Sequence, residues 1–588
     1  MLGVVSLNGG RLAACLATNA NARNLEEARL RQVKIRGGRG PGSTIEDMNI
    51  RALFAAALVA AALVAQSRDR RPNYSGGVLR PDQACYDVRR YELSVDVDPA
   101  AETIVGSLTM RAEALTECRV FAMDLDDCFK VDAVDLDGLD VPYAFRDGRI
   151  VMRPVSPLAA GVRFDVRVRY RGAPRAAKSS LEDGITWSKT KAGDPWIATR
   201  CREHGADLWW PCKDHPSDKP DGFDLRCTVP AGLVCASNGC LQGTPVTAAG
   251  RTTFHWRTTS PISNHCVAMN IAPYVLLTDT FTCVDGSRTP VAFYVLPGSE
   301  RKAKRCMRAF LDHVAVFERV LGPYPFRSEK YGLAETPHTG GPNQTILGYG
   351  NGFRDEQYDQ RHNHELAHEW WGNLVTCKGW QDAWLHEAFA TYMQPLYREI
   401  RFGRRAYEAE IHRHRTVNKA PLAPRRELST QEIDLDGNDI AYKGSLVLHT
   451  LRYVLGDESF LEALRRFAYP TPAARRRVDG GQVRFVDTED FVRLVNEVAG
   501  EDLGWFFEVY VRRAALPCLV YAVVDGKLEL EWEVPDGLPF PLSVPVSVGG
   551  VEVRARMDAG KGSIDVSTAD FDIDPGRRLL MARPRKRR

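Results

Sequence analysis

The chain has 588 residues, of which 44% are hydrophobic and 26% charged, and its formal net charge at pH 7 is +3. This length exceeds one ordinary hydrophobic core, so about two to four domains are expected. The composition excludes a disordered protein, and the near-neutral charge gives no electrostatic footprint for nucleic acid or acidic lipid, so no nucleic-acid partner is expected.

The amino-terminal segment has the pattern of an export signal. Residues 48–66 contain Arg51, then an apolar run over 52–65, then small and polar residues, which is the order found in cleaved signal peptides. The run is short for a bilayer span, so no stable membrane span is expected after cleavage, whereas an uncleaved signal would anchor the protein. A buried alanine-rich helix is the alternative. We expect translation to start at Met48, residues 1–47 to be a non-structural leader, and the protein to be exported, either periplasmic or secreted.

Three further regions differ in hydrophobic period. Residues 78–275 alternate with period two, as in RYELSVDVDP and RFDVRVRYRG, which predicts an antiparallel β domain. Helical periodicity dominates residues 276–515. Alternation returns over 516–582, with Asp-Gly at a predicted hairpin turn, and 583–588 is a basic tail, expected to be a solvated terminus. The predicted fold class is a multidomain α+β protein with an amino-terminal antiparallel β domain, a mostly helical domain and a small carboxy-terminal β-sandwich.

Fourteen cysteines occur, thirteen of them from Cys85 onward. The chain contains no CxxC pair, the pattern typical of a zinc ribbon or a redox motif. In an oxidising compartment Cys118 could bridge to Cys128, or Cys235 to Cys240, although spacing does not fix the connectivity.

The helical region contains a metal-binding pattern. His364 and His368 are four residues apart in HELAH, so on a helix both imidazoles project from one face and can share a metal ion. Glu365 lies beside them, where it could take a proton from a water at the metal without being a ligand itself. A catalytic zinc ion requires three protein ligands and one open position. After eighteen intervening residues, Glu387 in a second helical pattern supplies the third ligand; a surface helix glutamate is the alternative for Glu387 taken alone.

Polar residues near the second helical pattern have expected supporting roles. Thr391 and Gln394 fall on the same helical face as Glu387 and could orient a ligand. His386 points to another face and is expected to be a bystander. Asp382 stands at the start of the helix, where an N-cap role is expected.

These motifs resemble a known family. HELAHEWWGN and WLHEAFATY resemble the gluzincin metallopeptidases of the membrane alanyl aminopeptidase and leukotriene A hydrolase family. WWPCKDHPSDKPDGFDLRCTVPAG at 209–232 resembles the signature of the family's β domain, LGPYPF at 321–326 resembles the lead-in to its catalytic domain, and DIAYKGSLVLHTLR resembles its tyrosine motif. The resemblance covers about residues 78–515, and it implies a thermolysin-like catalytic domain over 276–515.

The resemblance also implies the chemistry. One Zn²⁺ per chain would be bound by His364, His368 and Glu387, with Glu365 as general base and peptides as substrates. Tyr442 would donate a hydrogen bond to the oxyanion of the tetrahedral intermediate. A half-buried tyrosine at a helix start is the alternative for Tyr442.

Two positions depart from the family pattern. The family's Gly-x-Met-Glu-Asn strand, whose glutamate binds the ammonium of the substrate, corresponds here to a stretch with Gly340, Gly341 and Pro342, and proline has no carboxylate and no backbone N–H. The second ammonium-binding position corresponds to Arg200, a cation that would repel an ammonium and attract an anion. Glu335 or Glu203 could bind the amine in a shifted register.

Aminopeptidase activity is the preferred prediction. One alternative is a peptidase of altered specificity, an endopeptidase or a specialised exopeptidase, because Pro342 replaces the amine-binding glutamate. Another is a non-catalytic binding scaffold, but retention of every metal and acid–base residue argues against it. The related epoxide hydrolase activity has no support from the residues identified.

Overall fold

The computed structural model describes residues 74–587 except for 180–181, 203–204, 434–438 and 567–569. The predicted leader, 1–47, and the predicted signal peptide, 48–66, lie outside the described residues. In the part of the chain that is described, none of the helices combines the length and the apolar character needed to cross a membrane.

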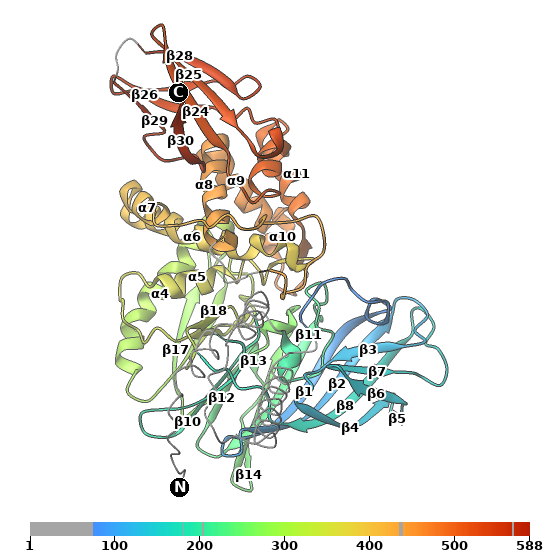
Figure 1. The fold of residues 1–588 in the computed structure, drawn as a ribbon. Helices are drawn as coiled ribbons and strands as arrows, with labels where there is room; N and C mark the ends of the chain where they lie inside the picture. Colours follow the sequence, from blue (N-terminus) through green and yellow to red (C-terminus); the bar gives the residue numbers. More distant parts are fainter. Residues whose placement is uncertain (1–73, 180–181, 203–204, 434–438, 567–569, 588) are drawn as a thin grey trace, which may run out of the picture. The chain divides into compact units, whose positions relative to one another are not determined.

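The first described domain is built of three sheets, which form the blue to green part of Figure 1. A nine-stranded sheet has the order β13-β15-β11-β1-β2-β8-β4-β5, with β14 paired to β15. Its strands are β1 (Tyr86–Asp98), β2 (Thr103–Ala114), β4 (Phe129–Leu136), β5 (Leu139–Asp140), β8 (Arg163–Gly172), β11 (Gly222–Pro230), β13 (Cys240–Leu241), β14 (Val246–Ala248) and β15 (Arg251–Thr258). The alternation in β1 buries Tyr91, Leu93 and Val95 on one face, as the period-two pattern predicts.

Two smaller sheets complete this domain. One has the order β12-β16-β10-β9 and the other β3-β7-β6. Their strands are β9 (Gly184–Lys189), β10 (Pro195–Arg200), β12 (Val234–Ser237) and β16 (Met269–Ala272), and β3 (Phe121–Asp124), β6 (Tyr143–Arg146) and β7 (Arg149–Met152); the short helices are α3 (Pro81–Ala84), η1 (Ala206–Leu208) and η2 (Asn264–Cys266). The predicted β domain is confirmed, but β1 and β11 pair in parallel. That pairing joins strands far apart in the sequence and leaves no local pattern.

A five-stranded sheet follows where the sequence predicts mainly helices. Its order is β17-β18-β19-β21-β20, and its strands are β17 (Val275–Thr282), β18 (Arg288–Val295), β19 (Tyr331–Glu335), β20 (Gly340–Gly341) and β21 (Leu347–Tyr349). All five residues of β19 are buried. A short strand covered on both faces has no alternation, so the hydrophobic period did not reveal it.

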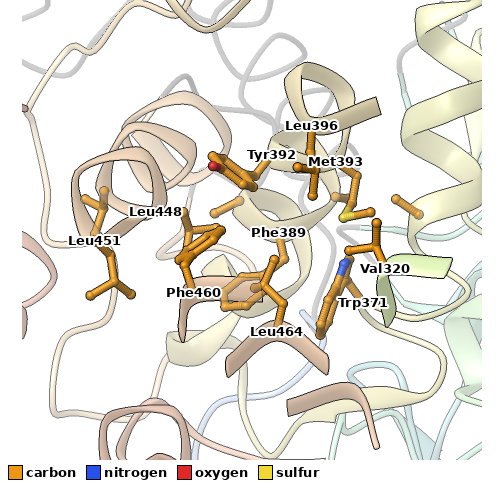
Figure 2. Close-up of a cluster of buried hydrophobic side chains, with 14 of the residues drawn as sticks. Val320, Trp371, Phe389, Tyr392, Met393, Leu396, Leu448, Leu451, Phe460 and Leu464 are labelled. Atoms are coloured by element: carbon orange, nitrogen blue, oxygen red, sulfur yellow. The ribbon is translucent and has the colours of Figure 1, made fainter. Parts of the chain in front are cut away.

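The helical prediction holds for the remainder of this domain. The helices are α4 (Glu300–Leu321), α5 (Gln360–Ala367), α6 (Trp384–Phe402), α7 (Arg404–Ile411), α8 (Gly444–Leu455), α9 (Asp457–Ala468), α10 (Pro472–Arg476), α11 (Thr488–Ala499) and α12 (Gly504–Tyr510), with the short turns η3 (Trp380–Asp382) and η4 (Asp439–Lys443) and the strands β22 (Val375–Cys377) and β23 (Arg484–Val486). Phe389 and Met393 of α6 pack with Leu448 of α8, Phe460 of α9 and Trp371 (Figure 2). Helix α6 therefore lies at the centre of the helical core.

Two small sheets form the carboxy-terminal region. One has the order β28-β25-β24-β30 and the other β27-β26-β29. The strands are β24 (Cys518–Val524), β25 (Lys527–Glu533), β26 (Val544–Val548), β27 (Val551–Ala555), β28 (Lys561–Asp565), β29 (Phe571–Ile573) and β30 (Ala582–Lys586), with η5 (Pro535–Gly537) between β25 and β26. Asp525 and Gly526 connect β24 to β25 with φ of 48° and 78°, as the two-residue hairpin predicted from Asp-Gly requires.

The basic tail is part of this region rather than a free terminus. Strand β30 pairs in parallel with β24. Arg585 forms an ion pair with Glu533, and Arg587 forms ion pairs with Glu529 and Glu531. The charged side chains from 583 to 587 are exposed, as expected for solvated residues. Their backbone nevertheless belongs to a strand, and the positive charges face acidic side chains of β25.

All thirteen cysteines from Cys85 to Cys518 are free in the described structure. The proposed Cys118–Cys128 and Cys235–Cys240 bridges are therefore not formed. The Cys118 thiol instead donates a hydrogen bond to the Cys85 carbonyl at 3.0 Å.

Candidate metal centre

Helix α5 positions the first part of the predicted metal site. Asp359 is its N-cap, and its carboxylate accepts a hydrogen bond from the backbone N–H of His362 at 3.0 Å, which satisfies one of the open donors of the first turn. His364 lies within the helix and His368 is its C-cap residue, still with helical backbone angles. The four-residue spacing therefore places both imidazoles on one side, as the sequence predicts.

Helix α6 brings Glu387 to the two histidines. One Glu387 oxygen lies 3.5 Å from His364 Nε2 and the other lies 3.6 Å from His368 Nε2, while the two Nε2 atoms are 3.2 Å apart. Tetrahedral zinc with bonds of about 2.0–2.1 Å separates its ligand atoms by about 3.3 Å. The two histidines have this spacing and each faces a different oxygen of Glu387. With their ligand atoms within 4.8 Å of one another, the three side chains form a group in the described residues that could hold one metal ion.

The surroundings prepare these side chains for a cation. His368 Nδ1 donates to the Trp371 carbonyl at 2.9 Å, since a carbonyl can only accept, and this leaves Nε2 with its lone pair for a metal. Burial lowers the pKa of His368. Burial opposes ionisation of Glu387, but the charges of Arg202 and of the histidines outweigh it, so the pKa of Glu387 lies well below its usual range. Two neutral imidazoles and one carboxylate are the donor set of known catalytic zinc sites.

The predicted general base lies against the edge strand of the five-stranded sheet. A Cβ atom on Gly340 would stand only 2.5 Å from Glu365 Oε1, so a side chain at residue 340 would displace the carboxylate from this position. Gly340 and Gly341 form the whole of β20 and pair on one side with β21. The two glycines predicted to bind substrate therefore lie beside Glu365, on a strand whose other edge can pair with an extended peptide.

The predicted oxyanion residue lies on a segment packed against α6. Tyr442 belongs to η4, which contacts α6, and its ring stacks on His414 with a centroid separation of 4.8 Å. Tyr442 is half-buried. The contact of η4 with the helix that carries Glu387 places the tyrosine motif next to the metal-binding helix.

Of the two arginines ahead of the Trp-Trp motif, Arg202 rather than Arg200 reaches the metal ligands. Arg200 is buried, with its guanidinium 3.4 Å from the Asp183 carboxylate. Arg202 Nη2 lies 2.6 Å from Glu387 Oε2, and Arg202 lines a cavity with Pro342. The sequence analysis matched Arg200 to the second ammonium-binding position; the structure pairs Arg200 with Asp183 and places Arg202, two residues further on, against Glu387.

Glu335, the other candidate for binding the substrate amine, is held elsewhere. Its carboxylate accepts hydrogen bonds from the backbone N–H of Leu296 at 2.8 Å and from the Ser299 hydroxyl at 3.0 Å, and burial raises its pKa. These contacts tie the end of β18 to the start of α4, so the structure gives Glu335 a structural role. Glu203 lies outside the described residues.

The supporting residues differ in part from expectation. The N-cap of α6 is Ala383, without a side-chain cap, so the N-cap prediction for Asp382 is wrong; its carboxylate accepts from the backbone and hydroxyl of Thr488 at 3.1 and 2.6 Å. His386 Nε2 accepts from the backbone N–H of Cys377 at 2.8 Å and ties α6 to β22. Gln394 accepts from Gln360 at 3.1 Å, which links α6 to the start of α5 rather than to a metal ligand.

A helical domain that carries the HExxH motif and a His–His–Glu centre, preceded by a β domain, is typical of a class of zinc metallopeptidases. The model of the peptidase M1 N-terminal domain matches residues 88–265, and the model of the peptidase family M1 domain matches residues 354–510. The chain belongs to peptidase family M1. The predicted family and its two-domain arrangement, a β domain and a helical catalytic domain, are confirmed.

Individual relatives agree with this assignment. The chain is 23% identical over 480 residues to a leucyl aminopeptidase of Saccharolobus solfataricus, covering 76% of this chain and 56% of that protein. It is 26% identical over 460 residues to aminopeptidase M1-B of Oryza sativa subsp. japonica, covering 73% and 47%. The chain spans about half the length of the curated relatives it matches.

A solved structure shares the fold. The M1 zinc metallopeptidase of Deinococcus radiodurans, crystallised as a variant with a Tyr-Ser-Ala substrate, aligns with a TM-score of 0.61 at 23% identity. The alignment covers 75% of this chain and 97% of that one. The two chains therefore share a fold over most of the described residues.

Proposed function

We propose that the protein is a zinc-dependent aminopeptidase that hydrolyses the first peptide bond of peptide substrates and uses one Zn²⁺ per chain. The observation that carries this proposal is the cluster of His364, His368 and Glu387, in which the two Nε2 atoms are 3.2 Å apart and each has a Glu387 oxygen within 3.6 Å. Glu365 lies beside this cluster. Membership of peptidase family M1 and the aminopeptidase relatives support the same activity.

The residues divide the reaction between them. A zinc ion held by His364, His368 and Glu387 would polarise the scissile carbonyl and make a water more acidic. Glu365 takes a proton from the attacking water and then delivers it to the nitrogen of the leaving amine, so the carboxylate is regenerated in each cycle. Tyr442 donates a hydrogen bond to the carbonyl oxygen as negative charge develops there.

Strand β20 orients the peptide for this reaction. An extended substrate paired with the outer edge of Gly340 and Gly341 would run past Glu365, because the Glu365 carboxylate lies against Gly340. Backbone pairing binds peptides irrespective of their side chains. Selectivity for the first bond therefore has to come from groups that contact the amino-terminal residue.

One experiment tests this function. The purified, zinc-loaded protein is incubated with one peptide in two forms, with its amino terminus free and acetylated, and the products are followed by mass spectrometry. Stepwise loss of first residues from the free form alone is expected. Cleavage of both forms, or internal cuts, would instead establish the altered specificity that Pro342 suggests. The absence of cleavage in a protein that binds less than a tenth of an equivalent of zinc would establish a scaffold.

We also propose that the protein is exported and that its carboxy-terminal sheets form a small β-sandwich. The sandwich is supported by the buried side chains of Leu530 and Val546, one from each sheet, which belong to the same core.

Export is supported by Arg51, the apolar run over 52–65 and the polar residues that follow. Amino-terminal sequencing of the mature protein from each cell fraction tests export: a start near residue 67 outside the cytoplasm is expected, and an intact Met48 or Met1 in the cytoplasm would contradict it.

A further inference from the structure

A small cavity lies next to the metal centre on the side of Arg202. Its volume is about 20 Å³, and its lining includes Arg202, His265, Pro342, Trp380, His386 and Glu387. A space of this size holds roughly one water molecule. A single carboxylate oxygen could replace such a water, whereas a bulky side chain could not.

The Arg202 guanidinium stands at the boundary between this cavity and the metal ligands. Its Nη2 lies 2.6 Å from Glu387 Oε2, and its side chain is 18% exposed. A guanidinium carries five N–H donors in a planar fork, so it can hold Glu387 and a second anion at once. The guanidinium is therefore placed to bind a carboxylate of a substrate that occupies the metal centre.

A second buried cation adds to the positive potential. Lys219 is buried, and its ammonium donates to the Asn373 carbonyl at 2.5 Å and to the Thr376 hydroxyl at 2.8 Å. Within the described residues no carboxylate forms an ion pair with Lys219. Asn373 also lines the cavity, so this charge lies close behind the cavity wall.

Glu387 is the one carboxylate among the described residues that line the cavity, and it pairs with Arg202. Burial, then the charge of Lys219, lowers the pKa of His265 to about 4, and His386 Nε2 accepts a hydrogen bond from the backbone N–H of Cys377, so neither ring carries a charge at pH 7. Pro342 contributes no carboxylate. Glu387 also faces His364 and His368, and Asp183 pairs with Arg200. Two cations, Arg202 and Lys219, thus face the single carboxylate of the lining, so a second carboxylate is favoured over an ammonium.

We propose that Arg202 is a specificity-determining residue that binds a substrate carboxylate in this cavity, so that the enzyme prefers peptides with an acidic residue on the amino side of the cleaved bond. The inference rests on the proposed peptidase function. A substrate with this acidic residue would make a charge–charge contact with Arg202, and its uncharged isostere could not make that contact.

The test uses matched tripeptides that differ only in the first residue, namely aspartate, asparagine or lysine. The zinc-loaded wild type is expected to have a kcat/KM for the aspartyl peptide about 10- to 100-fold above that for the asparaginyl peptide, the range of a charge-assisted hydrogen bond. Arg202→Gln should reduce this ratio to near 1, Arg202→Lys should keep part of it, and Arg202→Glu should reverse the preference towards lysine. Arg301→Gln, which removes an exposed arginine of α4, is the matched control and should leave the ratio unchanged.

A binding measurement separates failure of this inference from failure of the proposed function. Calorimetry with the Glu365→Gln protein should give tighter binding of the aspartyl than of the asparaginyl peptide, and the added substitution Arg202→Gln should remove the difference. Hydrolysis of all peptides with equal efficiency would overturn the carboxylate site and leave the peptidase function standing. Selective binding of the aspartyl peptide without hydrolysis would overturn the function and leave the site standing. If neither is seen, both are overturned.

Discussion

Gly444 and Ala388 lie so close together that a Cβ atom on Gly444 would stand 2.3 Å from the Ala388 Cβ. Gly444 begins α8 directly after η4, the turn that carries Tyr442, and Ala388 follows the metal ligand Glu387 in α6. The absence of a side chain at residue 444 is therefore what lets the tyrosine segment approach the metal-binding helix.

Gly444→Ala should move η4 away from α6. We expect a loss of about 1–3 kcal/mol in the free energy of unfolding, as for overpacking of a core, and a decrease in kcat larger than any change in zinc content. Ala388→Gly alone should cost about 1 kcal/mol through helix propensity. The double variant Ala388→Gly/Gly444→Ala removes the clash, so a double-mutant cycle from denaturant unfolding should show a favourable coupling. Additive losses would contradict the close contact.

Glu365→Gln should separate metal binding from turnover. The metal keeps its three ligands while the water loses its base, so we expect a full equivalent of zinc by mass spectrometry and a kcat lower by about 10²- to 10⁴-fold. Glu356→Gln, which changes a half-exposed carboxylate outside the site, serves as the control and should retain activity. Undiminished turnover in the Glu365 variant would refute its role as general base.

Zinc should stabilise the folded protein through the His–His–Glu centre. A ligand that binds only the folded state at a thousand times its Kd stabilises it by about 4 kcal/mol. Thermal unfolding of the chelator-treated protein should therefore begin at a lower temperature than that of the loaded protein, and His368→Ala should abolish the difference. His255→Ala changes a histidine of β15 that bonds Asp224 and should leave the zinc-dependent shift in place. A shift that survives in the His368 variant would place the metal elsewhere.

His449 should make the stability depend on pH. Its Nε2 donates to the Arg577 carbonyl at 3.1 Å, so Nδ1 of the neutral ring accepts from the Tyr407 hydroxyl at 2.6 Å. Burial lowers the pKa of His449 to about 3, whereas a histidine in the unfolded chain titrates near 6.5. Between these values the unfolded chain binds a proton that the folded chain does not, so stability is lost as the pH falls below about 6.5.

His449→Gln removes this titration while keeping a donor and an acceptor. As the pH falls from 7.5 to 5, the free energy of unfolding of the wild type should decrease by about 2 kcal/mol more than that of the variant. Denaturant unfolding at each pH measures this difference. Tyr407→Phe deletes the partner hydroxyl but keeps the imidazole, so its pH profile should parallel that of the wild type. A constant difference between the His449 variant and the wild type would show that His449 does not titrate as described.

The sequence by itself determined the features that depend on short spacing. The interval between His364 and His368 fixes their common direction on a helix, because the helix repeats every 3.6 residues. Asp525-Gly526 defines its hairpin because both residues accept positive φ. The alternation over 78–275 identified a β domain for the same reason, since side chains along a strand alternate between its faces. Glu387 was predicted as the third ligand because a catalytic zinc ion needs three protein ligands and a second helical pattern carries this glutamate, and α6 brings it to the histidines.

The tertiary structure decided what depends on contacts between distant segments. Only the packed chain shows that β1 pairs in parallel with β11, that β19 is a strand buried on both faces, and that β30 neutralises its charges against β25. It also shows that Arg202, and not Arg200, reaches Glu387, and that the Glu335 carboxylate holds α4. The direction of a long side chain and the partner of a buried charge are set by what packs around them, which a local pattern does not contain.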